Sequence, residues 1–168
     1  MERVTDTYVF FWNGPFSNWY THGMRSEFKY KGLKFFNSEQ AFMWEKAVFF
    51  NDIDIAEEII KFGHEPKAAK HMGRQIKGFD AQKWSEVSFD IMVNVNYEKY
   101  SQSPWLKEIL LSTENKTIVE SSPVDLVWGI GIHWENDDCL DESKWRGQNL
   151  LGKALMEVRK KLKDGIKG

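Results

Sequence analysis

The sequence has one cysteine, four prolines and four histidines among its 168 residues. Cys139 alone cannot form an internal disulfide, and no Cys-x-x-Cys motif or Cys/His pair indicates a metal site. We therefore expect neither a metal nor another cofactor. No apolar run approaches the length of a membrane span, and the N-terminus lacks the apolar segment of a secretory leader. These absences predict a cytoplasmic protein that does not bind membranes.

The chain also lacks a strong charge of either sign, with a formal net charge of -2 and a pI of about 6.1. Tight binding along a nucleic-acid backbone requires a basic face, so this balance argues against it without excluding a local basic patch. Aromatic residues are frequent, at 15% with eight Trp, and some of these rings could hold planar ligands while most fill the core. Length and hydrophobic content predict one domain over residues 1–168.

The most informative stretch is a helix predicted to begin at Ser38. Asn37 is suited to cap it, and Gln40 stands three residues later, where a capping box has its partner. The helix is apolar on nearly every side, which indicates burial. Glu39 and Lys46 are two turns apart, about 10 Å along the axis, so they lie on nearly the same face. An acid and an amine above an apolar surface are what we expect of a catalytic site.

Both charged residues also have ordinary structural explanations. A glutamate in the first turn is favoured by the helix dipole, as Glu39 would be. A lysine can lay its stem on apolar surface and keep its ammonium in water, as Lys46 could. These residues by themselves leave the catalytic and the structural interpretations open.

The segment before this helix is predicted to form a strand, a loop and a hairpin. Residues 9–12 read as a short buried strand. In the loop over residues 13–20, Asn18 and its aromatic neighbours could line a binding site, or Phe16 could simply anchor a turn in the core. Residues 27–36 alternate apolar and polar side chains around a Lys-Gly pair, which predicts a hairpin turn.

Two later helices carry further candidates. A short helix over residues 67–72 is closed by Gly73 and followed by Arg74. The Arg74 guanidinium could hold a phosphate or carboxylate, or it could be a solvated charge at a helix end. Asp80 is suited to cap a long helix, and Trp84 on its apolar stripe belongs either to the core or to the wall of a cleft.

The C-terminal part offers a second group of candidates. Asp125 supplies a carboxylate or serves a turn, Trp128 supplies a ring, and Gly129 opens a Gly-x-Gly that permits close backbone approach to a ligand. It is not a dinucleotide fingerprint, because the third glycine and the following helix are absent. Residues 133–144 read as an exposed acidic loop. Asn149 is suited to cap a final amphipathic helix, whose first amides could meet an anion.

Six motifs in this order carry a resemblance. They are Gly-x-Phe-Ser-Asn at residues 14–18, Ser-Glu-Gln-Ala-Phe at 38–42 with Lys46, Gly-Arg at 73–74, Trp84, Asp-x-x-Trp-Gly at 125–129, and a Gly-x-Asn-x-Leu-Gly motif with a following Leu-Met-x-Val-Arg within 147–159. Together they resemble the NADAR family, also called YbiA-like, over roughly residues 9–162. The stretch between Trp128 and Asn149 is longer than in the compact bacterial members, which bears on substrate identity more than on chemistry.

The resemblance implies a single helix-rich α+β domain with a few short strands. It also implies an N-glycosidase that hydrolyses the bond between a base or amine nitrogen and C1 of a ribose. The substrate would be either a ribosylamino-pyrimidine phosphate intermediate of riboflavin synthesis or ADP-ribose on a modified guanine in nucleic acid. The alternative is a module that binds ADP-ribose or a related nucleotide without cleaving it.

Residue roles follow from the resemblance together with the helix geometry. Glu39 would stabilise positive charge at C1 or take a proton from the attacking group, and Lys46 would act as an acid or as a nucleophile that forms a Schiff base. Substrate binding is assigned to Asn18, Arg74, Trp84, Asp125, Trp128, Gly129 and Asn149.

Overall fold

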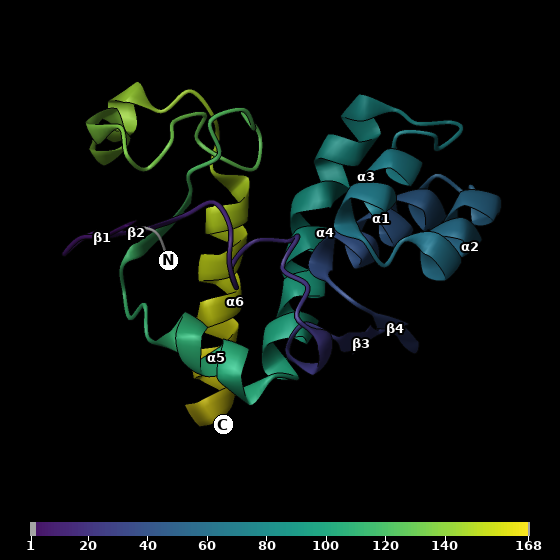
Figure 1. Ribbon diagram of the computed structural model, residues 1–168, viewed down its shortest axis with the longest axis horizontal. Helices are drawn as coiled ribbons and strands as arrows, with labels where there is room; N and C mark the ends of the chain where they lie inside the picture. The colour runs from purple at the N-terminus through teal and green to yellow at the C-terminus, as the bar shows by residue number, and fades with distance from the viewer. Residues whose placement is uncertain (1–2, 168) are drawn as a thin grey trace. The chain divides into compact units, whose positions relative to one another are not determined.

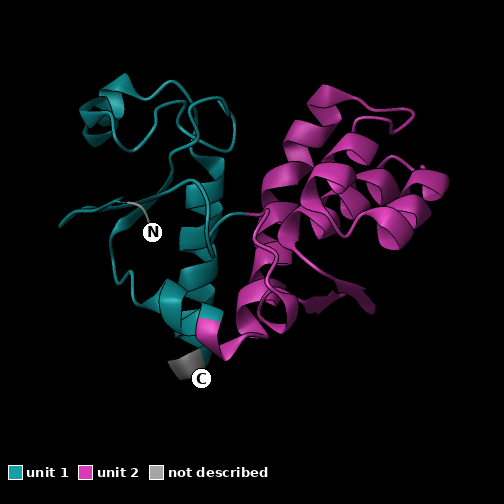
Figure 2. Ribbon diagram, in the orientation of Figure 1, with its two compact units in different colours: residues 1–17, 106–168 teal, residues 18–105 magenta. Residues whose placement is uncertain are grey.

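The computed structural model describes residues 3–167, and the chain forms two compact units. The first unit comprises residues 1–17 and 106–168, and the second comprises residues 18–105 (Figure 2). The chain therefore starts in the first unit, builds the whole second unit, and returns. The single domain expected over residues 1–168 stays a prediction.

The first unit is a small sheet covered by a long C-terminal helix (Figure 1). Its strands are β1 (Arg3–Val4), β2 (Tyr8–Phe11) and β5 (Thr117–Glu120), in the order β1-β2-β5. β1 and β2 run antiparallel, whereas β2 and β5 run parallel. Parallel neighbours need a long connection, and here the entire second unit lies between them in the sequence.

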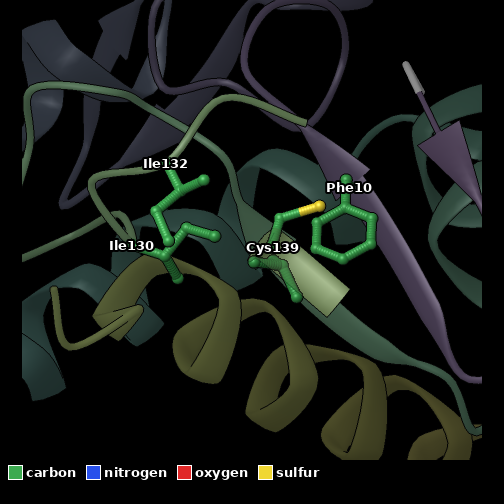
Figure 3. Close-up of a cluster of buried hydrophobic side chains, with 5 residues drawn as sticks. Phe10, Ile130, Ile132 and Cys139 are labelled. Carbon is green, nitrogen blue, oxygen red and sulfur yellow. The ribbon is translucent and has the colours of Figure 1, made fainter. Parts of the chain in front are cut away.

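The core of the first unit lies between this sheet and the segments that follow β5. Phe10 and Val119 pack with Ile130, Ile132 and Cys139, and Figure 3 shows Phe10, Ile130, Ile132 and Cys139 converging. Cys139 is a free thiol that is fully buried in this cluster. The predicted exposed loop over residues 133–144 is thus mostly exposed as expected, but Cys139 anchors it to the core.

Helix α6 (Leu150–Lys167) covers the sheet with the apolar face that the sequence predicts. Its buried side chains recur at helical spacing: Leu151, Ala154, Leu155, Val158 and Leu162. Gly152 permits close approach to β5, because a Cβ there would lie 2.1 Å from the carbonyl oxygen of Ile118. Two single-turn helices, Asp137–Leu140 and Glu142–Lys144, precede α6.

The second unit contains a hairpin and four helices. The helices are α1 (Ser38–Phe49), α2 (Ile53–Phe62), α3 (Pro66–Gly73) and α4 (Ala81–Ser101), with a short turn of helix at Gly23–Arg25. Helix α5 (Pro104–Leu111) follows α4 and crosses the boundary between the units.

The hairpin forms where the sequence predicts it. Strand β3 (Phe28–Tyr30) pairs antiparallel with β4 (Leu33–Phe35). The two turn residues, Lys31 and Gly32, have φ values of 51° and 79°, as a two-residue type I′ turn requires. The inward residues Phe28, Tyr30 and Phe35 are buried in a cluster with Ala41 of α1 and Val95 of α4.

One local prediction needs correction. Gln40 does not close a capping box on Asn37, because its side-chain oxygen accepts from Phe36 N and its amide donates to Ile59 O. Helix α2 is capped by Asp52, which accepts from Ile55 N. The buried guanidinium of Arg159 donates to Thr113 Oγ1 and to the carbonyl of Lys116, both at 2.8 Å. The side chains of Gln40 and Arg159 are thus held by segments that are distant in the sequence.

Six α-helices and five short strands among residues 3–167 confirm the predicted α+β class. None of the helices in this part of the chain is both long enough and apolar enough to cross a membrane.

Candidate active site

The N-terminus of α1 is held by two residues that lie outside it. Asn37 Oδ1 accepts from Gln40 N at 2.9 Å, which is the predicted N-cap. Glu39 N donates to the carbonyl of Asn18 at 3.0 Å. Glu39 therefore lies in the first turn with its backbone fixed, and only 9% of the residue is exposed.

Asn18 is buried and its side chain is engaged inside the second unit. Its Nδ2 lies 3.2 Å from the sulfur of Met92, and its Oδ1 accepts from Asn96 Nδ2 at 3.3 Å. Asn96 in turn accepts from Ser38 Oγ at 3.0 Å, so the loop, α1 and α4 are tied together at this point. Asn18 thus contacts Met92, Asn96 and the backbone of Glu39, and its predicted contact with substrate stays a prediction.

Lys46 lies two turns along α1, half-buried, with its amine held by α3. Its Nζ donates to the carbonyl of Gly73 at 3.1 Å and lies 4.5 Å from the ring centroid of Phe79. Burial is the largest influence on the Lys46 amine and lowers its pKa. The Glu39 carboxylate raises that pKa, and the Arg74 guanidinium lowers it. The charges of Glu39 and Arg74 therefore both influence the Lys46 amine.

Gly73 lets α3 come close enough to make this contact. A Cβ at Gly73 would lie only 2.2 Å from the sulfur of Met43, so no larger residue fits without a shift. The carbonyl of Gly73 then reaches Lys46, and Arg74 follows directly at the end of α3. Arg74 is exposed, so its guanidinium can meet an anion from solvent while its charge acts on Lys46.

Aromatic rings line the C-terminal half of α1. The Trp84 centroid lies 5.2 Å from that of Phe42 and 6.2 Å from that of Phe50, and Phe50 contacts Phe79 edge-to-face at 5.3 Å. Trp84 is partly buried in this group, so it has core contacts and some accessible surface. The predicted stacking of Trp84 on a base stays a prediction.

The remaining predicted site residues belong to the first unit. Asp125 Oδ1 accepts from Val127 N at 2.9 Å and from Trp128 N at 2.8 Å, which is the turn role that the sequence left open. Gly129 lies in a tight backbone environment, since a Cβ there would lie 3.1 Å from the carbonyl oxygens of Asp125 and Glu120. Trp128 is partly buried.

Asn149 joins α6 to the sheet of the first unit. Its Oδ1 accepts from Glu120 N and its Nδ2 donates to Ile118 O, each at 2.9 Å. The residue is 1% exposed and has a φ of 54°, a left-handed conformation that asparagine tolerates well. These contacts give Asn149 a structural role directly before α6. Its role in substrate binding stays a prediction.

The comparison with known proteins identifies the family. The model of the NADAR domain matches residues 10–163. The chain belongs to the NADAR family. Its relatives include Protein irg-1 of Caenorhabditis elegans, with 39% identity over 96% of this chain and 82% of that protein. N-glycosidase R617 of Acanthamoeba polyphaga mimivirus is 37% identical over 92% of this chain and 96% of that protein.

Two further similarities connect this NADAR chain to a riboflavin biosynthesis protein and to a solved structure. The maize chloroplastic riboflavin biosynthesis protein PYRR is 35% identical over 65% of this chain, which is 16% of that protein. The NMR structure of the E. coli protein YbiA aligns with a TM-score of 0.76 and 28% identity, over 98% of this chain and 89% of that chain. An N-glycosidase function therefore occurs in the family, and the fold is shared with YbiA.

The candidate site in the second unit brings together Glu39, Lys46 and Arg74, all three predicted from sequence. It also includes Phe79, which sequence reasoning missed because no motif marks it. Phe79 is 47% exposed and lies in the loop between α3 and the Asp80 cap of α4. Among residues 3–167, no group of three or more His, Cys, Asp or Glu side chains could hold a metal ion. The Glu39 carboxylate can act as an acid or a base, and the Lys46 amine can act as an acid or a nucleophile.

Proposed function

We propose that this chain is an N-glycosidase that hydrolyses a ribosyl C1–N bond, with Glu39 and Lys46 as its catalytic residues. The observation that carries the proposal is the half-buried Lys46 amine, whose pKa is lowered by burial and which shares the electrostatic field of Glu39. A lowered pKa increases the neutral fraction of an amine near neutral pH, as a nucleophilic lysine requires. Relatives over most of the chain are named N-glycosidases, which supports the same reaction class.

The reaction needs stabilisation at two places. As the C1–N bond breaks, positive charge develops at C1 and negative charge develops on the leaving base. The Glu39 carboxylate stabilises the charge at C1, an effect that is large in a site with little water. The leaving nitrogen takes a proton and departs as a neutral base.

In the covalent route, the neutral Lys46 amine attacks C1. The Nζ–C1 bond forms, the electron pair of the C1–N bond goes to the leaving base, and the proton lost by Nζ balances the one that the base gains. The ribosyl ring then opens: the bond between C1 and the ring oxygen breaks, that oxygen takes the electron pair and the second Nζ proton, and a C1=Nζ Schiff base forms on Lys46. Water adds to C1 and the C1–Nζ bond breaks, so the amine regains both protons from the water and the sugar leaves as an aldehyde that recloses its ring. Glu39 moves the protons of the water.

Neighbouring groups prepare Lys46 for this role. The hydrogen bond to Gly73 fixes one N–H of the amine, and Phe79 covers part of the amine and limits its hydration. Arg74, exposed at the end of α3, is the proposed contact for a substrate phosphate. Both proposed substrates, the ribosylamino-pyrimidine phosphate and ADP-ribosylated guanine, carry a phosphate on the ribose that reacts.

The test compares wild type with Glu39→Gln and Lys46→Met on both substrates, with products identified by mass spectrometry. Lys160→Met is the matched control, because Lys160 is an exposed lysine on α6. We expect each catalytic variant to lose at least a hundredfold in kcat/KM and the control to stay within twofold of wild type. Release of ADP-ribose or of ribose 5-phosphate names the substrate. Binding without release of either product would show that the chain is a nucleotide-binding module and not an enzyme.

Borohydride trapping separates the covalent route from direct attack by water. Reduction during turnover should leave a ribosyl adduct on the peptide that contains Lys46, and none in Lys46→Met. The pH profile gives a second measurement. A nucleophilic amine must be neutral, so kcat/KM should rise with pH and level off at a pKa below the ordinary lysine value of about 10.4. Turnover without an adduct would leave Lys46 as an acid only.

A further inference from the structure

A lysine and a tryptophan face each other beside the candidate active site. Lys70 is exposed on α3, and its Nζ lies 5.7 Å from the ring centroid of Trp19, within the range of a cation–π contact. Trp19 is 42% exposed, which is a large accessible ring for a residue type that is usually covered. Neither residue has a part in the chemistry proposed above.

Hydrogen bonds within the second unit connect this pair to the proposed catalytic residues. Trp19 directly follows Asn18, whose carbonyl accepts from Glu39 N. Lys70 lies on the same helix as Gly73, whose carbonyl accepts from Lys46 Nζ. The Trp19–Lys70 contact therefore closes a ring of contacts that runs through Glu39 and Lys46, entirely within the second unit.

The spacing of two cations on α3 indicates which ligand this part of the site could hold. Lys70 and Arg74 are four residues apart at the end of α3, so they are neighbours on one helix face, with Cβ atoms about 6 Å apart. One phosphate on the reacting ribose needs only Arg74. Two cations one turn apart can meet two phosphoryl groups, and the Trp19 ring beyond them offers a surface for a planar base.

We propose that Trp19 and Lys70 form a subsite for a second base–phosphate group of the substrate, remote from the ribose that reacts. This inference rests on the proposed function. The group is either the distal nucleotide of a dinucleotide-type ligand such as ADP-ribose or the neighbouring nucleotide of a strand. In both cases Lys70 meets a phosphate and Trp19 stacks on a base. A ribosyl monophosphate does not reach this subsite.

The test measures binding by calorimetry, which needs no turnover. The probes are ADP-ribose, ribose 5-phosphate and a 5′-phosphorylated dithymidine dinucleotide. The variants are Trp19→Ala, Trp19→Phe and Lys70→Ala, with Lys67→Ala as the control because it removes an exposed lysine from the same helix. Circular dichroism checks that each variant folds.

We expect Trp19→Ala to weaken the binding of ADP-ribose about tenfold, and Trp19→Phe to recover most of that loss, because stacking needs a ring. Lys70→Ala should weaken it several-fold with a reduced dependence on salt, and Lys67→Ala should stay within twofold. Ribose 5-phosphate should bind equally well to all variants. Loss of affinity for the dinucleotide in Trp19→Ala would identify a strand as the source of the second group, and loss for ADP-ribose alone would identify the distal nucleotide.

Two results separate this subsite from the proposed reaction. If ADP-ribose and the dinucleotide bind equally to wild type and Trp19→Ala, the subsite is wrong, whether or not the protein cleaves its substrate. If binding depends on Trp19 but no substrate is cleaved, the proposed reaction is wrong and the subsite stands.

Discussion

Replacing Gly73 with alanine tests how closely α3 must approach α1 for the amine of Lys46 to be held. The new Cβ would lie 2.2 Å from Sδ and 3.2 Å from Cγ of Met43. Ordinary contacts between such atoms are about 3.5–4.0 Å, so the two groups must separate by more than about 1 Å. Met43 is buried, and its side chain has little room to turn away.

Two free-energy terms of opposite sign decide the effect on stability. Overpacking of this kind typically costs about 1–3 kcal/mol, and alanine is favoured over glycine within a helix by about 1 kcal/mol. We therefore expect the free energy of unfolding to fall by no more than about 2 kcal/mol. Activity should fall further, because a shift of 1 Å lengthens the 3.1 Å contact between Lys46 Nζ and the carbonyl of Gly73 beyond hydrogen-bonding range. A displacement of this size can reduce kcat/KM about a hundredfold.

The measurements are urea unfolding and kcat/KM for Gly73→Ala, Met43→Ala and the double variant. Removing the Met43 side chain beyond its Cβ leaves the nearest contact at 3.6 Å, so the double variant should regain activity relative to Gly73→Ala. An unchanged kcat/KM in Gly73→Ala would refute the reasoning, because Met43 would then have moved at no cost to the site. A loss that the double variant does not restore would show that the effect does not pass through Met43.

Two further predictions concern buried polar groups outside the proposed chemistry. Lys99 is 1% exposed, and burial lowers its pKa to about 7. Between pH 7 and 9.5 the unfolded chain still binds a proton that the folded chain has lost. The free energy of unfolding of wild type should therefore rise by about 3 kcal/mol relative to that of Lys99→Met over this range, as measured by urea unfolding. Parallel pH profiles for the two proteins would contradict this. Asn149→Ala should lose about 2–4 kcal/mol in urea unfolding, because it leaves Glu120 N and Ile118 O buried without the Asn149 partner. A changed KM with unchanged stability would instead favour the substrate-binding role.

The sequence predicted best those features whose causes are local. The hairpin depends on alternation and on two turn residues, Lys31 and Gly32, which adopt the required positive φ. Asn37 caps α1 as predicted, because a cap needs only a backbone amide three residues away. Glu39 and Lys46 lie on one helix, so their separation follows from helix geometry alone.

The parts that sequence reasoning missed depend on contacts between segments. Nothing near Phe79 in the sequence indicates that its ring lies under Lys46, because that contact requires the loop after α3 to return to α1. The pairing of Trp19 with Lys70 likewise joins residues about fifty positions apart. Gln40 shows the same effect at short range, since it follows a capping pattern and yet bonds Phe36 and α2.

Arg74 connects substrate binding to the charge on Lys46. In the free protein the Arg74 guanidinium lowers the pKa of Lys46 and so favours the neutral amine. A phosphate held by Arg74, as proposed, would offset that positive charge and bring negative charge toward the amine, which favours its protonated form. In the complex it is burial that favours the neutral Lys46 amine, and this burial increases when a bound substrate and Phe79 exclude water from the amine. In the complex, burial and the bound phosphate would therefore act on the pKa of Lys46 in opposite directions.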